Sequence, residues 1–332
     1  MIRILLAVLL LGFSLAYARI GEGLEVVLEI LEPFALSQQA GGEYISDSGF
    51  TLTFEERNAL LYSLSGTGLL DEDGIALVSQ AIGAATGYLE GIAVPVKQFF
   101  ETRVGELSGR GPIPFGVEEY SLALDVSGAT APFMVTFRLT LPTVPDEQFP
   151  PARHTLGPAD ASYVIREFSD FQCPACANFY RVSLPLIKEQ LLARGDVRFE
   201  FHYLPLEGLF INSFPAAEAA ECVAYLNGPE GFWSFHGALF THQRSWANLE
   251  NPTSYFVELA ADLGLATEGL ATCLSERTFY TTVREAQTHA MQVLGLRSTP
   301  SVFLGGYRVR NHANLDDYLR AMALQDAFAL DE

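Results

Sequence analysis

The chain has 332 residues, of which 49% are hydrophobic and 18% charged, and its 40 acidic residues outnumber 20 basic ones for a formal net charge of −20. This length and apolar fraction suit two globular domains and exclude a disordered or collagen-like chain. Because a strongly acidic surface repels phosphate, the charge also argues against nucleic acid as a partner.

The first 18 residues have the pattern of an export signal peptide. Arg3 supplies a positive charge, residues 4–15 form a short apolar run, and the Ala-Tyr-Ala of residues 16–18 matches the small-residue cleavage pattern. The apolar run is too short for a membrane span of ordinary length, although an uncleaved N-terminal anchor is the alternative. We therefore expect an extracytoplasmic protein, periplasmic or secreted, whose mature chain starts at Arg19.

Residues 19–141 are expected to form a small N-terminal α+β domain of unknown role. Apolar residues at helical spacing predict helices over residues 24–31, from Thr53 to Leu64, from Asp71 onward, and over residues 95–107. This part of the chain has no Cys, no His and no Gly-rich phosphate loop. We therefore expect a packing or association module.

The pattern then changes from helical to alternating. Residues 120–126 and 133–141 alternate apolar and polar side chains, which predicts two strands paired across a turn. Two strands alone are marginal in water, so further strands, a covering helix or a second copy of the chain must complete the sheet. A homodimer joined through this domain is therefore one of the expected arrangements.

Five prolines between residues 142 and 158 predict a stiff, extended linker. After it, an apolar strand at residues 162–168 leads into Cys173-Pro174-Ala175-Cys176 and an amphipathic helix that ends near Arg194, and a second strand covers residues 196–204. A Cys-x-x-Cys at the strand-to-helix turn of a β-α-β unit favours redox chemistry over metal binding.

The remainder of a second domain, residues 159–332, is predicted to be mostly helical. An alanine-rich helical pattern runs from about residue 212 to 296. Residues 301–310 then predict a hairpin around two glycines, and residues 314–328 predict a final helix.

Cys173 and Cys176 have the spacing of a redox-active pair. A thiolate rather than a thiol attacks a disulfide, and the N–H groups and positive dipole end of the helix should lower the pKa of Cys173. We expect Cys173 to be the exposed, acidic thiol, and Cys176 to be buried and placed to attack a mixed disulfide on Cys173. A structural zinc site would need four ligands, and Cys222 and Cys273 are single, so zinc and a purely structural Cys173–Cys176 disulfide are weaker alternatives.

Three separated elements occur in order at compatible distances. They are Glu-Phe-Ser-Asp-Phe-Gln-Cys-Pro-Ala-Cys at residues 167–176, a helical insertion, and Ser-Thr-Pro-Ser-Val-Phe-Leu-Gly-Gly at residues 298–306. With these motifs, residues 160–328 resemble the DsbA family of the thioredoxin fold. The resemblance implies a thioredoxin fold with a helical insertion over about half of the chain.

The resemblance also implies roles for individual residues. Pro300, preceded by Thr299, would be the family's cis proline facing the active-site cysteines, and its bend would expose the Thr299 backbone for pairing with an extended substrate. Glu167 would be the family's buried acid, with a raised pKa that lets it shuttle the proton of Cys176, whereas a solvated strand-end carboxylate is the alternative. Asp170 is expected to be a loop or capping acid.

Cys222 and Cys273 match a second disulfide that several members of the resembled family carry. In an oxidising compartment an even number of cysteines permits complete pairing, and closing so long a loop could contribute up to about 4 kcal/mol in the chain-entropy model. Two buried free thiols are the alternative.

These observations predict an exported thiol-disulfide oxidoreductase that forms disulfides in other extracytoplasmic proteins, with unfolded or partly folded exported proteins as substrates. No cofactor is expected because the electrons pass through cysteines, and a membrane redox partner would reoxidise the pair. A disulfide isomerase or reductase dimerised by the N-terminal domain is the alternative within redox chemistry. A noncatalytic binding or chaperone protein that keeps the disulfide only for structure is the alternative of another class.

Overall fold

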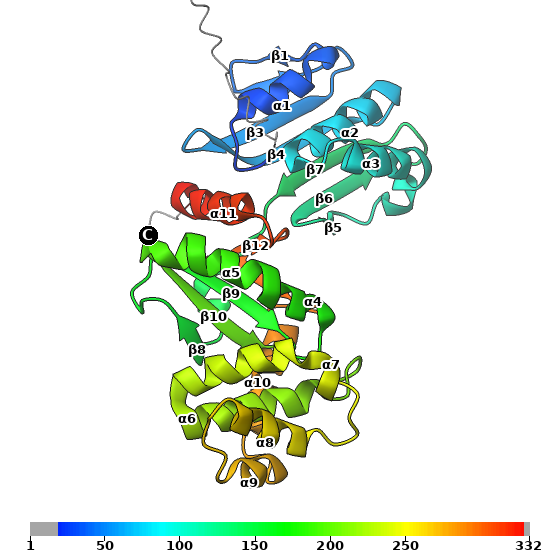
Figure 1. Cartoon of the computed structure of the whole chain (residues 1–332). Helices are drawn as coiled ribbons and strands as arrows, with labels where there is room; N and C mark the ends of the chain where they lie inside the picture. The colour runs from blue at the N-terminus through cyan, green and yellow to red at the C-terminus, as the bar shows by residue number, and fades with distance from the viewer. Residues whose placement is uncertain (1–18, 329–332) are drawn as a thin grey trace, which may run out of the picture. The chain divides into compact units, whose positions relative to one another are not determined.

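The structure, a computed structural model, describes residues 19–328. The chain divides into two compact units, one that ends at Pro142 and one that begins at Thr143, and each is described by itself (Figure 1). The export signal predicted at residues 1–18 lies outside the described residues. Within residues 19–328, no helix is both long enough and apolar enough to cross a membrane.

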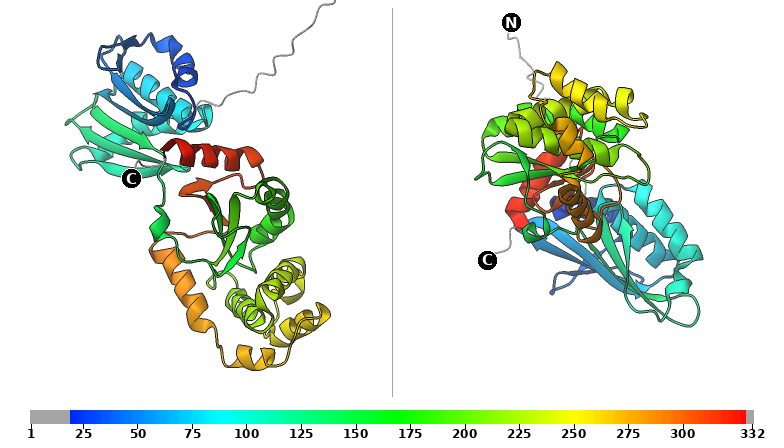
Figure 2. Two further views of the ribbon diagram at one scale, coloured as in Figure 1. Left: turned by 90° about the vertical axis from the view of Figure 1, so that its left-hand side faces the viewer. Right: turned by 90° about the horizontal axis from the view of Figure 1, so that it is seen from below.

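The N-terminal unit is a seven-stranded antiparallel sheet with the strand order β1-β2-β3-β4-β7-β6-β5, and its helices cover one face of the sheet (Figures 1 and 2). The strands are β1 (Ser37–Gln38), β2 (Glu43–Ile45), β3 (Thr51–Arg57), β4 (Leu60–Leu69), β5 (Ile113–Val117), β6 (Tyr120–Ser127) and β7 (Met134–Thr140). The helices are α1 (Leu24–Ile30), α2 (Glu72–Thr86) and α3 (Glu90–Thr102), with short 3₁₀ turns η1 (Glu32–Phe34) and η2 (Val104–Leu107).

Helix α2 contributes many buried side chains to this core. Its ends are capped, and the side chains between them are mostly small and apolar. The Asp71 side chain accepts a hydrogen bond of 2.8 Å from the Gly74 N–H at the start of the helix. Gly87 ends the helix with a φ of +79°, a conformation that glycine adopts without strain. Between these caps, residues such as Leu77 and Ile82 are buried against the inward side chains of the sheet.

The helix predicted from Thr53 to Leu64 is wrong, because this segment forms the hairpin of β3 and β4. Asn58 and Ala59 connect the two strands, and both have positive φ values, 49° and 60°, which no α-helix contains. The helix predicted over residues 95–107 also has different bounds, since α3 begins at Glu90 and ends at Thr102.

The predicted pair of strands forms, with Val126 of β6 opposite Val135 of β7. Strand β4 pairs with the free side of β7 and β5 with the free side of β6, so the chain itself completes the sheet. The edges of the sheet are β1 and β5. A dimer through an open edge of this hairpin therefore loses its basis, and the oligomeric state stays a prediction.

The second unit has the predicted thioredoxin fold with a helical insertion. Its five-stranded sheet has the order β12-β11-β9-β10-β8, in which only β9 and β10 are parallel. The strands are β8 (His154–Leu156), β9 (Tyr163–Ser169), β10 (Val197–Tyr203), β11 (Ser301–Leu304) and β12 (Tyr307–Val309). The parallel register of β9 and β10, with the helix after β9 between them in the chain, is the β-α-β unit predicted from the sequence.

The helix that follows the Cys-x-x-Cys is irregular. It consists of α4 (Pro174–Asn178), η4 (Phe179–Ser183), α5 (Leu184–Leu186), η5 (Ile187–Leu191) and η6 (Leu192–Arg194), where η4 and η5 are π-helical turns. Pro185 lies between these turns and has no N–H for the helical ladder, which accounts for the wider hydrogen bonding around it.

The insertion lies between β10 and β11 and consists of helices, and a last helix follows β12. The insertion contains α6 (Ser213–Thr241), α7 (Gln243–Trp246), α8 (Thr253–Asp262), α9 (Leu270–Ser275) and α10 (Tyr280–Gln292), and the last helix is α11 (Leu315–Phe328). Helix α6 is interrupted at Gly228, whose φ is +70°.

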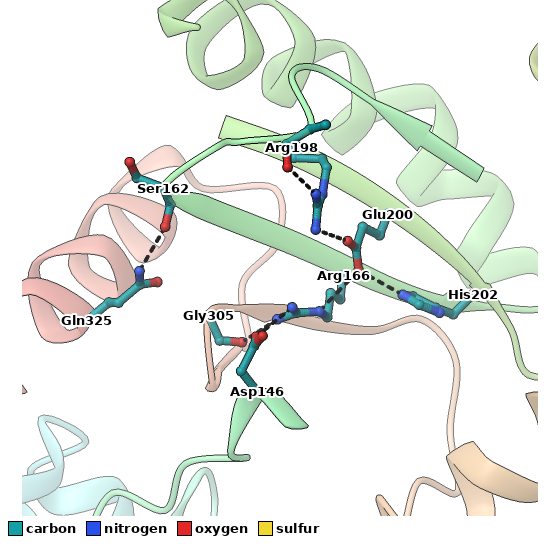
Figure 3. Close-up of polar contacts among 9 residues, drawn as sticks. Asp146, Ser162, Arg166, Arg198, Glu200, His202, Gly305 and Gln325 are labelled. Atoms are coloured by element: carbon teal, nitrogen blue, oxygen red, sulfur yellow. Dashed lines mark hydrogen bonds and ion pairs between the residues drawn. The ribbon is translucent and has the colours of Figure 1, made fainter. Parts of the chain in front are cut away.

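Residues 143–158 are part of the second unit rather than the extended linker expected for residues 142–158. Strand β8 pairs with β10, and the Phe149 ring is buried against Phe168 and Phe303. The guanidinium of Arg166 on β9 contacts the Asp146 carboxylate at 2.6 Å (Figure 3). The segment also contains a 3₁₀ turn, η3 (Asp146–Gln148), so it is not extended throughout. Its aromatic side chains gain more from burial on the sheet than from solvent exposure.

A buried cluster of charged residues joins β9 to β10. Arg166 of β9 lies opposite Glu200 of β10, and the Arg166 Nε to Glu200 Oε2 distance is 3.1 Å. Arg198 and His202 contact the same carboxylate at 2.6 and 3.2 Å (Figure 3). Because charges inside a protein are costly unless they are paired, this cluster specifies how the two strands align.

A disulfide joins Cys222 of α6 to Cys273 of α9, with an S–S distance of 1.98 Å. The two cysteines are 51 residues apart in the chain, and the bond links two helices of the insertion. It therefore closes a long loop and restricts the unfolded chain strongly.

We expect the double variant Cys222→Ala/Cys273→Ala to lower the free energy of unfolding of the second unit by about 2–4 kcal/mol, because it removes this restriction on the unfolded chain. Urea unfolding followed by tryptophan fluorescence measures it, since both tryptophans, Trp233 and Trp246, lie in the insertion. An unfolding midpoint equal to that of the parent protein would contradict the expectation.

Candidate active site

The sequence places Cys173 at the point where β9 has ended and α4 begins. Cys173 caps the helix in an extended conformation, Pro174 occupies the first helical position, and the Ala177 N–H donates to the Cys173 carbonyl at 3.1 Å. Proline suits this position because it has no N–H and its φ is already helical. Cys176 lies one turn further along, and both cysteines are free thiols in this structure.

The two thiols differ strongly in acidity. The hydrogen bond from the Cys176 thiol, followed by the Thr299 side chain and the N–H groups of Cys176 and Ala175, lowers the pKa of Cys173 to about 6 against the opposing effect of burial. Burial, followed by the neighbouring Cys173, raises the pKa of Cys176. Cys173 is 7% exposed and Cys176 is 0% exposed, so the thiol expected to be exposed is itself mostly covered.

Thr299 and Pro300 lie beside Cys173, and the peptide bond between them is cis. The Cys173 thiol donates to the Thr299 carbonyl oxygen at 3.5 Å. The Thr299 Oγ1 atom is buried and has no hydrogen-bond partner among the described residues. A thiolate at Cys173 would accept a hydrogen bond from this hydroxyl, which agrees with its lowering of the Cys173 pKa.

Glu167 lies on β9 and is 1% exposed, so its position is that of a buried acid and not of a solvated strand-end carboxylate. Burial raises the pKa of Glu167 to about 8. Its Oε1 atom has no hydrogen-bond partner among the described residues. A negative charge on Glu167 contributes to the raised pKa of Cys176. At neutral pH the carboxyl group is mostly protonated and can give up a proton to a thiolate at Cys176.

Amide side chains for which the sequence indicates no role hold the loop before Cys173. The Gln243 amide donates to the carbonyl oxygens of Phe171 and Cys173 at 2.8 and 3.0 Å. Gln172 donates to the Ala247 carbonyl at 2.6 Å and accepts from the Asn212 N–H at 2.6 Å. These bonds tie the loop to α7 and to the start of α6, and no local pattern indicates partners so distant in the chain.

Asp170 does more than the loop or capping role expected of it. Its carboxylate accepts hydrogen bonds from the N–H groups of Gln172 and Leu206 at 2.7 Å each, and from the Ser213 hydroxyl at 2.6 Å. Burial raises the pKa of Asp170, and these bonds oppose the rise. Asp170 therefore joins the loop before Cys173 to the segment after β10 and to the start of the insertion.

We expect alkylation of the reduced protein at pH 5–6 to modify Cys173 and spare Cys176, because only Cys173 has an appreciable thiolate fraction there. The alkylation rate should rise with pH with a midpoint near the pKa of Cys173, about 6. Mass spectrometry of the digested protein locates the label, and denatured protein labelled at pH 8 is the control in which both thiols react. Preferential labelling of Cys176 would reverse the assignment.

A second expectation concerns Glu167, whose pKa is raised from 4.5 to about 8. Between these values the folded protein keeps a proton that the unfolded chain releases, so the stability falls as the pH rises through this window. We expect Glu167→Gln to remove this fall, which amounts to up to about 5 kcal/mol for a shift of this size. Urea unfolding at pH 5 and pH 8 measures it in a Cys173→Ser background, where the Cys173 thiol no longer titrates. Parallel stability curves for Cys173→Ser with and without Glu167→Gln would show that Glu167 has an ordinary pKa.

Comparison with known proteins agrees with this site. A family model described as thioredoxin matches residues 150–323. Disulfide bond formation protein D of Bacillus subtilis is 30% identical over 171 residues, which are 49% of this chain and 72% of that protein. The crystal structure of oxidised BdbD from Bacillus subtilis is 26% identical, with a TM-score of 0.46, and the match covers 52% of this chain and 91% of that one.

Another relative differs in its overall length. The Na(+)/H(+) antiporter NhaA 3 of Salinispora tropica is 27% identical over 191 residues, 58% of this chain, but the chain spans only 26% of that antiporter. The thioredoxin match covers more than half of the chain and contains both free cysteines. The chain therefore belongs to the thioredoxin family and, within it, to the DsbA-like thiol-disulfide oxidoreductases.

Proposed function

We propose that this protein is an exported oxidase that forms disulfides in other extracytoplasmic proteins through Cys173 and Cys176. The lowered pKa of Cys173, about 6, is the observation that carries the proposal. A stabilised thiolate favours the reduced form of the pair, so the oxidised form readily accepts electrons from other thiols. The export signal predicted from the sequence and the disulfide between Cys222 and Cys273 suit an oxidising compartment.

The reaction starts from the oxidised pair. A substrate thiolate attacks the Cys173 sulfur, a substrate–Cys173 disulfide forms, and the Cys173–Cys176 bond breaks. Cys176 leaves as a thiolate in a buried place that raises its pKa, and it takes the proton of Glu167. Glu167 regains a proton from solvent after this step.

The second step releases the oxidised substrate. Another thiolate of the substrate attacks the substrate sulfur of the mixed disulfide, and Cys173 leaves as a thiolate. A thiolate with a pKa of about 6 is a good leaving group at neutral pH. The substrate loses two electrons and two protons, and the enzyme keeps both electrons in its dithiol, with no cofactor required.

The reduced pair must then lose two electrons to a redox partner, for which we propose a membrane protein. We propose unfolded or partly folded exported proteins as substrates. The cysteine pair of the substrate has to reach Cys173 of this protein, which is only 7% exposed. Native proteins with buried cysteines would not meet this requirement.

The reduction potential of the pair tests the direction of the reaction. Thioredoxin has a nucleophilic thiol of pKa about 7 and a potential of about −270 mV, and one pKa unit corresponds to about 1.4 kcal/mol or about 30 mV. We therefore expect a potential of about −240 mV or less negative from equilibration with glutathione. A potential more negative than about −270 mV would contradict the oxidase and favour a reductase.

Two cysteine variants test the catalytic step on a reduced, unfolded substrate protein. With Cys176→Ser pre-oxidised by a small disulfide on Cys173, we expect a mixed disulfide with the substrate or rapid transfer to it, whereas Cys173→Ser should give neither. Non-reducing electrophoresis detects both products. Equal protection of the substrate from aggregation by the parent protein and Cys173→Ser, without any disulfide formation, would instead support a noncatalytic chaperone.

A further inference from the structure

A groove of about 830 Å³ lies directly beside Cys173 in the second unit. Both chain neighbours of Cys173, Gln172 and Pro174, line it, so a polypeptide whose cysteine reaches Cys173 passes the mouth of this groove. The other lining residues are Ala177, Arg181, Phe210, Phe240, Thr241, His242, Gln243, Arg244, Ser245, Ala247 and Asn248.

Two different elements form the walls of the groove. On one wall, Pro174, Ala177 and Arg181 follow one another at spacings of three and four residues, which places them on one face of the helical segment after Cys173. The end of α6 and α7, with Arg244, form the other wall. The two walls are fixed to each other because Gln243 of α7 holds the carbonyl oxygens of Phe171 and Cys173.

The groove is lined by cationic side chains and by no acidic one, in a chain where 40 acidic residues outnumber 20 basic ones. Arg181 and Arg244 are both exposed. Within residues 143–328, Arg181, Arg244 and Lys188 have neither a hydrogen bond nor an ion pair, whereas each other arginine has at least one interaction. Arg181 and Arg244 both line the groove beside Cys173.

We propose that this groove binds an acidic segment of the polypeptide substrate, next to the cysteine that reacts with Cys173. The proposal rests on the proposed function, since it names a preference among that enzyme's substrates. Arg181 and Arg244 would pair with Asp or Glu side chains of the segment, while Phe210 and Phe240 give apolar contact. The volume is near the upper end of the range for small-molecule sites, which leaves room for several residues of an extended chain.

Three peptides that differ only in charge test the preference. Each carries the same pair of reduced cysteines, flanked by three Glu, three Gln or three Lys residues, and the second-order rate constant of its oxidation by the oxidised protein is measured at low ionic strength. Because an exposed ion pair contributes about 0.2–1 kcal/mol, two pairs predict an acidic peptide that reacts about two- to thirtyfold faster than the neutral one. The basic peptide should react more slowly than the neutral one.

The variants Arg181→Gln and Arg244→Gln should each reduce the ratio of the rate with the acidic peptide to the rate with the neutral peptide. The double variant should bring this ratio to about one. Lys188→Gln is the matched control, because it removes an unpaired cation of the same unit that does not line the groove. It should leave the ratio unchanged. The preference should also decline when the salt concentration rises to 0.5 M, since ions screen exposed pairs.

The outcomes separate the two proposals. If the parent protein oxidises no peptide, the proposed function fails; if it oxidises all three at equal rates, or if the double variant keeps the preference, only the groove proposal is overturned. If the double variant also oxidises glutathione more slowly, by the same factor as the acidic peptide, the groove binds a small thiol. This outcome would overturn the proposal that it binds a polypeptide. The rate with the neutral peptide and the alkylation rate of Cys173 show that the variants are folded.

Discussion

The opposite electrostatic environments of two thiols one helical turn apart are the constraint on which the chemistry of the second unit depends. Cys173 stands at the start of α4, where N–H groups of the first turn and the thiol of Cys176 can donate to its sulfur. Cys176 lies on the same turn but is fully buried, and burial disfavours its thiolate. A negative charge on this pair therefore resides on Cys173, which in the proposed reaction is the sulfur that the substrate attacks and that later leaves as a thiolate. The β-α-β unit contributes to the contrast because its strand leads the chain to the start of a helix, where N–H groups face Cys173.

This contrast requires the loop before Cys173 to keep its place, and the helical insertion supplies the contacts. Gln243 holds two carbonyl oxygens of the loop, and Asp170 binds both Leu206, in the segment after β10, and the start of α6. The Gln243 and Asp170 side chains are buried, so breaking one of their contacts would leave an unsatisfied polar group as well as a looser loop. The insertion is thus a scaffold for the thiol pair, and its own disulfide between α6 and α9 lies apart from these tethers in the chain.

Local sequence patterns were sufficient to predict the elements whose conformation depends on neighbouring residues in the chain. The strand-to-helix turn at Cys173, the alternating strands β6 and β7, and the helical insertion could all be predicted from spacing and period. The segment from Thr53 to Leu64 was not predictable in this way, because the same leucines fit a helical period and a buried strand. Asn58 is a residue type that adopts positive φ, but Ala59 after it is not, so the pair does not have the glycine of a typical hairpin turn. The tethers of Gln243 to the Cys173 loop depend on tertiary packing over about 70 residues of chain, which no local pattern encodes.

Neighbouring residues of β9 show why the burial of Glu167 has functional meaning. Arg166 and Glu167 point to opposite faces of the sheet, and both are buried. On the Arg166 face, burial pushes the pKa of Glu200 upward, but the hydrogen bond from His202 and the charges of Arg166 and Arg198 bring it below its ordinary value. On the other face no cationic side chain among residues 19–328 pairs with Glu167, and burial raises its pKa to about 8. The buried carboxylate of Glu200, which joins β9 to β10, is thus paired with cationic side chains. An unpaired carboxyl beneath two thiols costs stability at neutral and higher pH, and in the proposed reaction it would hold the proton that Cys176 takes up when the disulfide opens.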